Sequence, residues 1–158
     1  MAMMIVPLLL LVAAGCSGKG SPASDGGWSE GISTPKALRS YVQEGKQPMA
    51  GYRLGSFLGE GKIVGKGTIP IKGSEPLSKD TAYSVTFLCN ADRDVPYRIG
   101  IRNGDGYHQM GHEEGCGGGI ASLTMPASTV PDATEVVIDA EPDGQVIAVV
   151  FEVVQEEE

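Results

Sequence analysis

The chain has 158 residues, with 12 Lys and Arg against 20 Asp and Glu, which gives a net charge of -8 at pH 7. This length predicts a single domain, because domains cluster near about 100–150 residues. The negative charge argues against binding to nucleic acid, because clustered Lys and Arg bind the phosphates. It also argues against a globular part that lies on an anionic bilayer, which would repel it.

The beginning of the chain has the layout of an export signal. An apolar segment runs from Met3 to Ala14 and is too short for a membrane-spanning helix, which needs about 20 apolar residues. Its length is typical of the apolar region of a secretory signal, which small residues follow where a peptidase cuts. The segment Ala14-Gly15-Cys16 resembles the end of the lipobox of bacterial lipoproteins and matches its last three positions. Ala13 stands where that family usually has Leu, and no basic residue precedes Lys19.

The resemblance implies that a peptidase removes residues 1–15 and that the sulfur of Cys16 carries a diacylglyceryl thioether. Two or more acyl chains hold a protein stably on a membrane, whereas one chain binds only marginally. We therefore expect the extracytoplasmic face of the cell membrane as the location, with the membrane as a partner through Cys16. Two other interpretations stay open at this stage: a cleaved signal with an incidental cysteine, and an uncleaved helix at the membrane interface.

The chain contains three cysteines, at positions 16, 89 and 116. An odd number in an exported protein usually leaves one thiol over. A lipid on Cys16 accounts for the odd one, and Cys89 and Cys116 then pair with each other outside the reducing cytosol. The sequence therefore predicts a disulfide between Cys89 and Cys116.

Residues 16–32 consist mainly of Gly, Ser, Pro, Ala and Asp, with a single Trp28. Such a composition does not bury enough apolar surface to fold, so we expect a flexible tether. A short amphipathic helix follows, with Ser33 or Thr34 as its N-cap and Pro35 where the missing N–H costs nothing. Its apolar face consists of Leu38, Tyr41 and Val42, and Gly45 ends it.

From Tyr52 onward, apolar residues alternate with polar ones, which indicates β-strands. The strands are expected at residues 52–58, 83–89, 97–101, 107–110, 120–125, 135–140 and 145–154. The glycine-rich segment 59–67 predicts a bulged or bent edge strand. Strand 83–89 alternates as a half-buried strand does, and strand 145–154 is apolar on both faces, which favours a central position. We expect this last strand to pair with strand 135–140 across the turn at 141–144.

Short strands with turn signals every 8–12 residues or so are typical of antiparallel sandwiches and barrels. The sequence therefore predicts an all-β fold: residues 33–158 form one antiparallel β-sandwich, of jelly-roll or Ig-like type, with one short N-terminal helix. The chain ends in Glu156-Glu157-Glu158, which predicts a solvated acidic tail.

Metal-ligating side chains gather in one segment, at His108, His112, Glu113 and Cys116. Two His four residues apart converge on a metal when they share a helix face, but the surrounding glycines argue against a helix. A cysteine held in a disulfide does not ligate either. We therefore expect the segment 105–119 to be a solvated loop held by the disulfide, with no metal and no cofactor.

The sequence contains no recognisable catalytic set, which predicts that the protein is not an enzyme. The favoured hypothesis is a lipid-anchored, non-catalytic module that binds a protein, an envelope polymer or a sugar. Aromatic residues make up only 6% of the chain, which weakens the sugar version of this hypothesis. The alternative is a lipoprotein that binds a metal or small ligand through the 105–119 loop, with His108, His112 and Glu113 as candidate ligands.

Overall fold

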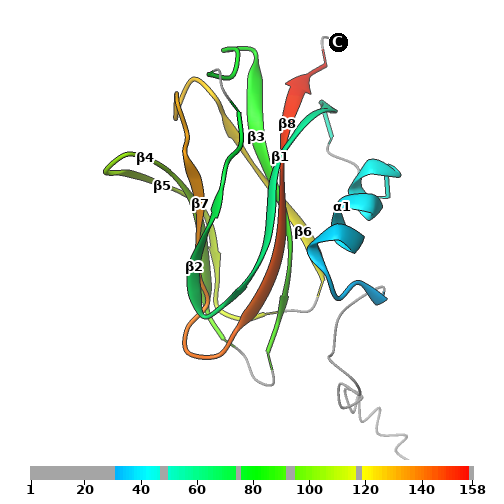
Figure 1. Cartoon of the computed structure of the whole chain (residues 1–158), viewed down its shortest axis with the longest axis vertical. Coiled ribbons are helices and arrows are strands. Elements are labelled where there is room, and N and C mark those ends of the chain that lie inside the picture. Colours follow the sequence, from blue (N-terminus) through cyan, green and yellow to red (C-terminus); the bar gives the residue numbers. More distant parts are fainter. Residues whose placement is uncertain (1–30, 47–49, 74–75, 92–94, 117–118, 157–158) are drawn as a thin grey trace, which may run out of the picture.

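The computed structural model describes residues 31–46, 50–73, 76–91, 95–116 and 119–156. It shows two stacked antiparallel sheets with a helix on the outside of one of them (Figure 1). The predicted signal peptide, the lipid site at Cys16 and nearly all of the tether lie outside the described residues.

The helix α1 spans Pro35–Gln43, and eight strands follow it within the described ranges. They are β1 (Tyr52–Val64), β2 (Lys66–Pro70), β3 (Thr81–Asn90), β4 (Tyr97–Asn103), β5 (Gly106–Glu113), β6 (Ile120–Pro126), β7 (Glu135–Asp139) and β8 (Gln145–Gln155). In the part of the chain that the structure describes, no helix has the length and apolar character needed to cross a bilayer.

The strands follow the order β1-β8-β3-β6 in sheet A and β2-β7-β4-β5 in sheet B. The pairs β1–β8, β2–β7, β3–β6 and β4–β5 arise when one long hairpin, with its tip between β4 and β5, is rolled up. This order is that of a jelly roll rather than of an Ig-like sandwich. The prediction of an all-β antiparallel sandwich with one short helix is therefore confirmed.

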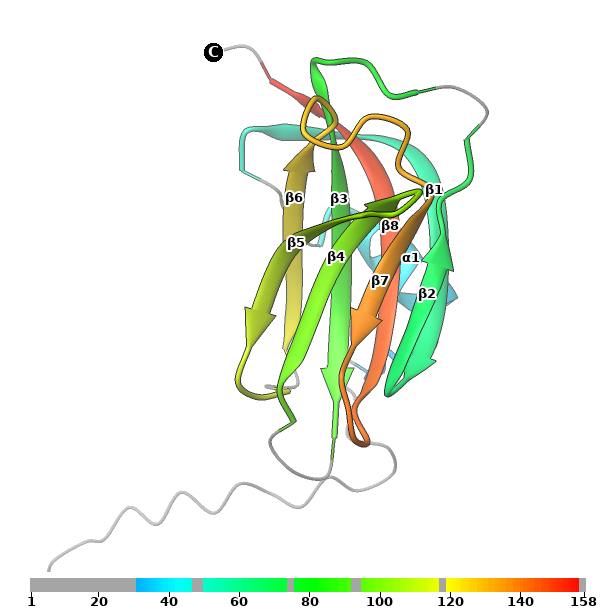
Figure 2. The same cartoon turned by 90° about the vertical axis from the view of Figure 1, so that its left-hand side faces the viewer.

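The prediction that strands 135–140 and 145–154 pair with each other is wrong. β7 belongs to sheet B, where it pairs with β2 and β4, and β8 belongs to sheet A, where it pairs with β1 and β3 (Figure 2). The turn between them carries the chain from one sheet to the other. Strands that are adjacent in sequence often form a hairpin. In this fold β7 instead lies between β2 and β4, and β8 lies between β1 and β3.

The two central strands of sheet A, β3 and β8, are buried on both faces, whereas the edge strands β1 and β6 are partly exposed. The inner face of sheet A packs against sheet B around residues such as Val85, Phe87 and Val150, while α1 packs on its outer face against Ile147 and Phe151. The expected central position of the last strand is confirmed. Strand β3 is not half-buried as predicted, because every residue from Thr81 to Cys89 is buried. On the outer side of β3, Thr86 shares a 2.7 Å hydrogen bond with Ser122 of β6.

The helix has the predicted ends. Thr34 is the N-cap, and its Oγ1 accepts a hydrogen bond of 3.2 Å from the N–H of Ala37. Gly45, with φ of +70°, follows the last turn in the left-handed conformation that glycine adopts without strain. Ile32 is only 5% exposed and packs in the same cluster as the helix, so the last residue of the predicted tether belongs to the domain.

The glycine-rich segment 59–67 forms the end of β1, a turn at Gly65 and the start of β2. Both strands lie at sheet edges, and the pairing of β1 with β8 shifts register on both sides of Phe57. The predicted edge position is therefore confirmed, but the bulges lie just before this segment, between Leu54 and Gly59, and residues 59–64 pair with β8 in regular register. Pro70 lies on the edge strand β2, where its missing N–H interrupts no ladder.

Candidate functional site

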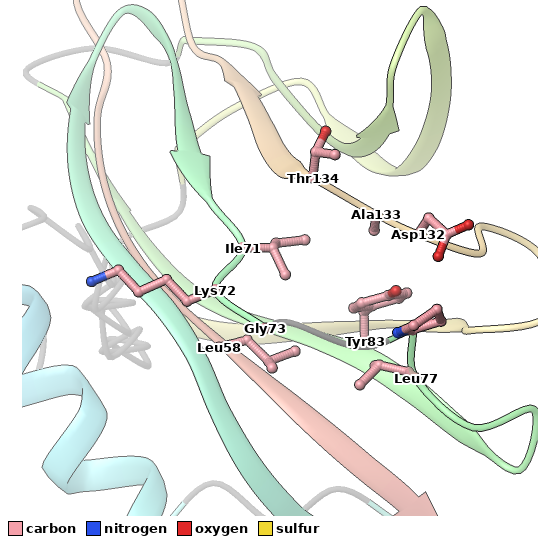
Figure 3. A pocket seen from close by; sticks show the side chains of 10 residues that line it. Leu58, Ile71, Lys72, Gly73, Leu77, Tyr83, Asp132, Ala133 and Thr134 are labelled. Atoms are coloured by element: carbon pink, nitrogen blue, oxygen red, sulfur yellow. The ribbon is translucent and has the colours of Figure 1, made fainter.

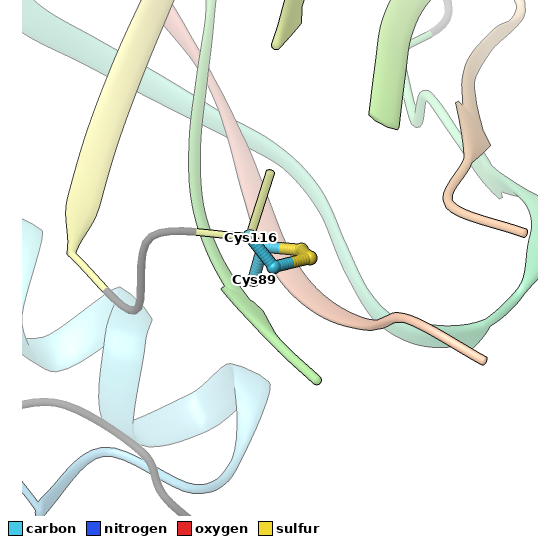
Figure 4. The surroundings of a disulfide bond; sticks show 2 residues. All are labelled: Cys89 and Cys116. Carbon is cyan, nitrogen blue, oxygen red and sulfur yellow. A yellow bond between two sulfur atoms is a disulfide. The ribbon is translucent and has the colours of Figure 1, made fainter. Parts of the chain in front are cut away.

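Cys89 and Cys116 form a disulfide, as predicted, with their Cα atoms 5.1 Å apart (Figure 4). Cys89 lies near the end of β3 and is 3% exposed, among the core residues between the sheets. Cys116 lies in the connection that leads from β5 in sheet B to β6 in sheet A. The disulfide therefore attaches this crossover to a central strand of the core.

The strand expected at 107–110 is present as β5, but it extends as far as Glu113, so less of the segment 105–119 is loop than the sequence predicted. Gly106 and Gly111 both belong to β5, and glycine is tolerated here because β5 is an edge strand with no partner on its far side in sheet B. At Gly111 a side chain would collide with Leu123 of β6, so glycine lets the two sheets close at this edge.

The two candidate metal ligands His108 and His112 do not converge. His108 pairs with Ile101, whose side chain is in the core, whereas His112 pairs with the exposed Arg98. A bulge between these pairs places the two imidazoles on opposite faces of β5. Four residues of strand also separate their Cα atoms by roughly 13 Å, too far for both rings to reach one ion. Within the described ranges, no group of three or more His, Cys, Asp or Glu side chains is placed to hold a metal ion.

Sheet B has an outer face on which α1 does not pack. This face is directed away from sheet A and from α1, and Figure 2 views the molecule from this side. By strand register its outward positions form three rows across the sheet. The rows are Lys66, Asp139, Arg98 and His112; Thr68, Val137, Gly100 and Gln109; and Pro70, Glu135, Arg102 and Tyr107.

Charged side chains of both signs lie on the outer face of sheet B. The Arg102 guanidinium donates to Oε1 of Glu135 at 2.7 Å, and Lys66 Nζ lies 3.7 Å from Oδ2 of Asp139. The Arg102–Glu135 pair is partly buried, which fixes the direction of the guanidinium more firmly than an exposed pair would. No ion pair of Arg98 occurs among the described side chains, and Arg98 is exposed.

Tyr107 is the aromatic residue of the outer face of sheet B, and it is 44% exposed. A Cβ atom added at Gly100 would come within 2.6 Å of Tyr107 Cζ, so the ring lies low across β4 in the space that the missing side chain leaves. Burial of one side of the ring raises the pKa of Tyr107, and the charges of Arg98, Asp139 and Arg102 act on it as well. The ring thus lies between the two arginines of β4.

A hollow of about 500 Å³ adjoins the row of Arg98 and His112. It is lined by Pro96, Tyr97, Arg98, His112, Glu113, Glu114, Asp139 and Glu141. Burial and the nearby Glu113 raise the pKa of Tyr97. The Gln109 amide nitrogen lies 3.2 Å from Nδ1 of His112, so these two exposed side chains of β5 contact each other.

A separate cavity of about 250 Å³ opens at the end of the sandwich where β2 ends and β7 begins (Figure 3). Leu58, Ile71, Leu77 and Tyr83 line it with apolar surface, and Asp132 and Thr134 lie at its edge. Lys72 extends away from it in Figure 3. The cavity is smaller than the roughly 300–1,000 Å³ of most small-molecule sites.

The sequence singled out His112 and Glu113 in this region but missed Tyr107, Arg98 and Arg102 as members of a surface. One signal was present: Arg98, Gly100 and Arg102 alternate along a predicted strand and therefore share a face. Which residues of other strands join them depends on the sheet order. Comparison of the chain with protein-family models, with curated proteins and with solved structures finds no match, so the geometry of this face carries the functional argument.

Proposed function

We propose that the protein is a lipid-anchored binding module on the extracytoplasmic side of the cell membrane, without catalytic activity. Its binding surface is the outer face of sheet B. The observation that carries the proposal is the asymmetry of the sandwich, because α1 packs on β8 and β1 of sheet A, whereas the outer face of sheet B presents an aromatic ring and charges of both signs. Exposed aromatic and arginine side chains are enriched at recognition surfaces.

Two features support export and anchoring. The Cys89–Cys116 disulfide suits an oxidising compartment, because cytosolic thiols are kept reduced. It also uses two of the three cysteines, which leaves Cys16 for the lipid that the lipobox resemblance implies. The membrane is then a partner through Cys16, and the ligand comes from the cell envelope.

The anchor is tested by Cys16→Ser in the full-length chain. We expect the variant to move from the membrane fraction to the soluble fraction, because it has no thiol to carry the acyl chains. Ser17→Ala is the matched control and is expected to stay with the membrane. The measurement is immunoblotting of membrane and soluble fractions, and Cys16→Ser protein that remains with the membrane would contradict the anchor.

The binding face is tested by Gln109→Arg, which places a long charged side chain in the middle row of the outer face of sheet B. We expect the immobilised variant to retain less material from a cell-envelope extract than the wild type, because the new side chain covers the face. Val64→Arg is the control, since Val64 is 65% exposed and lies on sheet A. Retained material is quantified by mass spectrometry and sugar analysis, and equal retention by both variants would argue against this face.

A further inference from the structure

We propose that the outer face of sheet B binds a neutral saccharide, with one sugar ring stacked on Tyr107. This inference rests on the proposed function, since it names the ligand of the same face. Among the described residues, Val64 and Tyr107 are the large hydrophobic side chains that are exposed. Val64 stands alone at an edge of sheet A, whereas Tyr107 lies among the polar groups of the outer face of sheet B.

The placement of the Tyr107 ring suits stacking. Because Gly100 has no side chain, the ring lies down over β4, with one side against the sheet and the other toward solvent. The face of an aromatic ring carries partial negative charge and attracts the partially positive C–H groups on the flat side of a pyranose. Such a ring also loses little conformational entropy on binding, because its position is already fixed.

Hydrogen-bonding groups surround the ring at the distances that strand spacing sets. Arg98 and Arg102 lie two residues on either side of Gly100, Glu135 holds Arg102 at 2.7 Å, and Gln109 lies beside Gly100. Guanidinium groups only donate, carboxylates only accept, and the amide does both. A sugar hydroxyl donates and accepts at once, so a mixed set of this kind matches neighbouring hydroxyls.

The charges of the face favour a neutral ligand over an ion. Lys66, Arg98 and Arg102 are opposed by Glu135 and Asp139, and two of the cations are already paired. The carboxylates of Glu113, Glu114 and Glu141 line the adjoining hollow and repel an acidic polymer. Binding that depends on hydroxyl groups rather than on net charge also changes little with salt.

The size of the face argues against a protein partner. Four strands about 4.8 Å apart and five residues of about 3.3 Å each give a flat area of roughly 300 Å². A stable protein interface buries about 800 Å² on each partner. A face of this size suits a short oligosaccharide better than the surface of a protein.

The test is isothermal titration calorimetry of the purified full-length protein with neutral oligosaccharides of glucose, mannose, xylose and N-acetylglucosamine. Oligogalacturonate serves as the acidic probe. We expect at least one neutral probe to bind, with a Kd that rises about tenfold in Tyr107→Ala and little in Tyr107→Phe, which keeps the ring. Val64→Ala is the matched control and is expected to leave the Kd unchanged. The melting temperature of each variant verifies that it is folded.

Several results would overturn the inference. These are the absence of binding to every neutral probe, neutral binding that Tyr107→Ala leaves intact, and binding of oligogalacturonate alone with strong salt dependence. If no saccharide binds while Gln109→Arg still abolishes retention of envelope material, the saccharide is wrong and the binding face stands. If Gln109→Arg affects neither measurement, the proposed face fails together with its ligand.

Discussion

Tyr83 is a phenol enclosed at the end of the core, where it lines the smaller cavity. It is 2% exposed, and this burial raises its pKa above the ordinary value of 10.0. A hydrogen bond with the Ala133 backbone acts in the opposite direction, and the charges of Asp132 and Glu152 raise the pKa further. Burial is the largest of these effects, because the interior solvates the phenolate poorly.

This shift predicts a loss of stability at alkaline pH. Because the folded state holds the phenol proton more tightly than the unfolded state, the contribution is complete below about pH 10 and is lost as the pH rises through the folded pKa. Tyr83→Phe removes this titration, so its melting temperature should fall less between pH 9 and pH 11. The variant also loses one hydrogen bond, worth about 1 kcal/mol, so each curve is compared with its own value at pH 7. Parallel curves would show that Tyr83 does not contribute to the alkaline loss.

The contact between α1 and sheet A shows how one element sets the burial of its neighbours. Leu38 and Val42 of the helix pack on β8, while Arg39 lies 4.8 Å above the ring of Phe57 and reaches Glu60 at 3.5 Å. The helix therefore covers the apolar outer residues of β8 and the part of β1 around Phe57, while the outer face of sheet B has no helix packed on it.

The connection between β5 and β6 is held to β3 by the Cys89–Cys116 disulfide, which spans 27 residues. Chain entropy assigns such a crosslink about 3–4 kcal/mol. The free energy of unfolding should therefore fall by about this amount when Cys89→Ala and Cys116→Ala are combined, as measured by urea denaturation in the Cys16→Ser background. Dithiothreitol treatment of the Cys16→Ser protein should produce a similar fall. An unchanged unfolding midpoint in both cases would contradict a stabilising crosslink.

The molecule as a whole has three layers, with sheet B open, sheet A in the middle and α1 outside (Figures 1 and 2). The two outer surfaces of the sandwich therefore differ, because α1 packs on the outside of sheet A and not on the outside of sheet B. In the proposed function the covered face stabilises the fold, and the open face is available to the ligand.

The local sequence determined the helix and most of the strands. Thr34 and Gly45 mark the ends of α1 through short-range hydrogen bonding and backbone freedom, and the alternation in 83–89 fixed which side chains share a face of β3. The cysteine count predicted the disulfide, and the two-sided apolar character of 145–154 predicted a central strand. These features depend on neighbouring residues or on composition, so the sequence carries them directly.

Only the tertiary structure decided which strands are neighbours and which sheet face is free. Arg102 and Glu135 meet across 33 residues because β7 pairs with β4 rather than with β8, and that choice depends on the burial of both sheets together. The same choice places Tyr107 beside Arg102 and over Gly100 on the outer face of sheet B. Alternation along a strand tells which residues share a face, but strand pairing is non-local, and it is the pairing that assembles the candidate site.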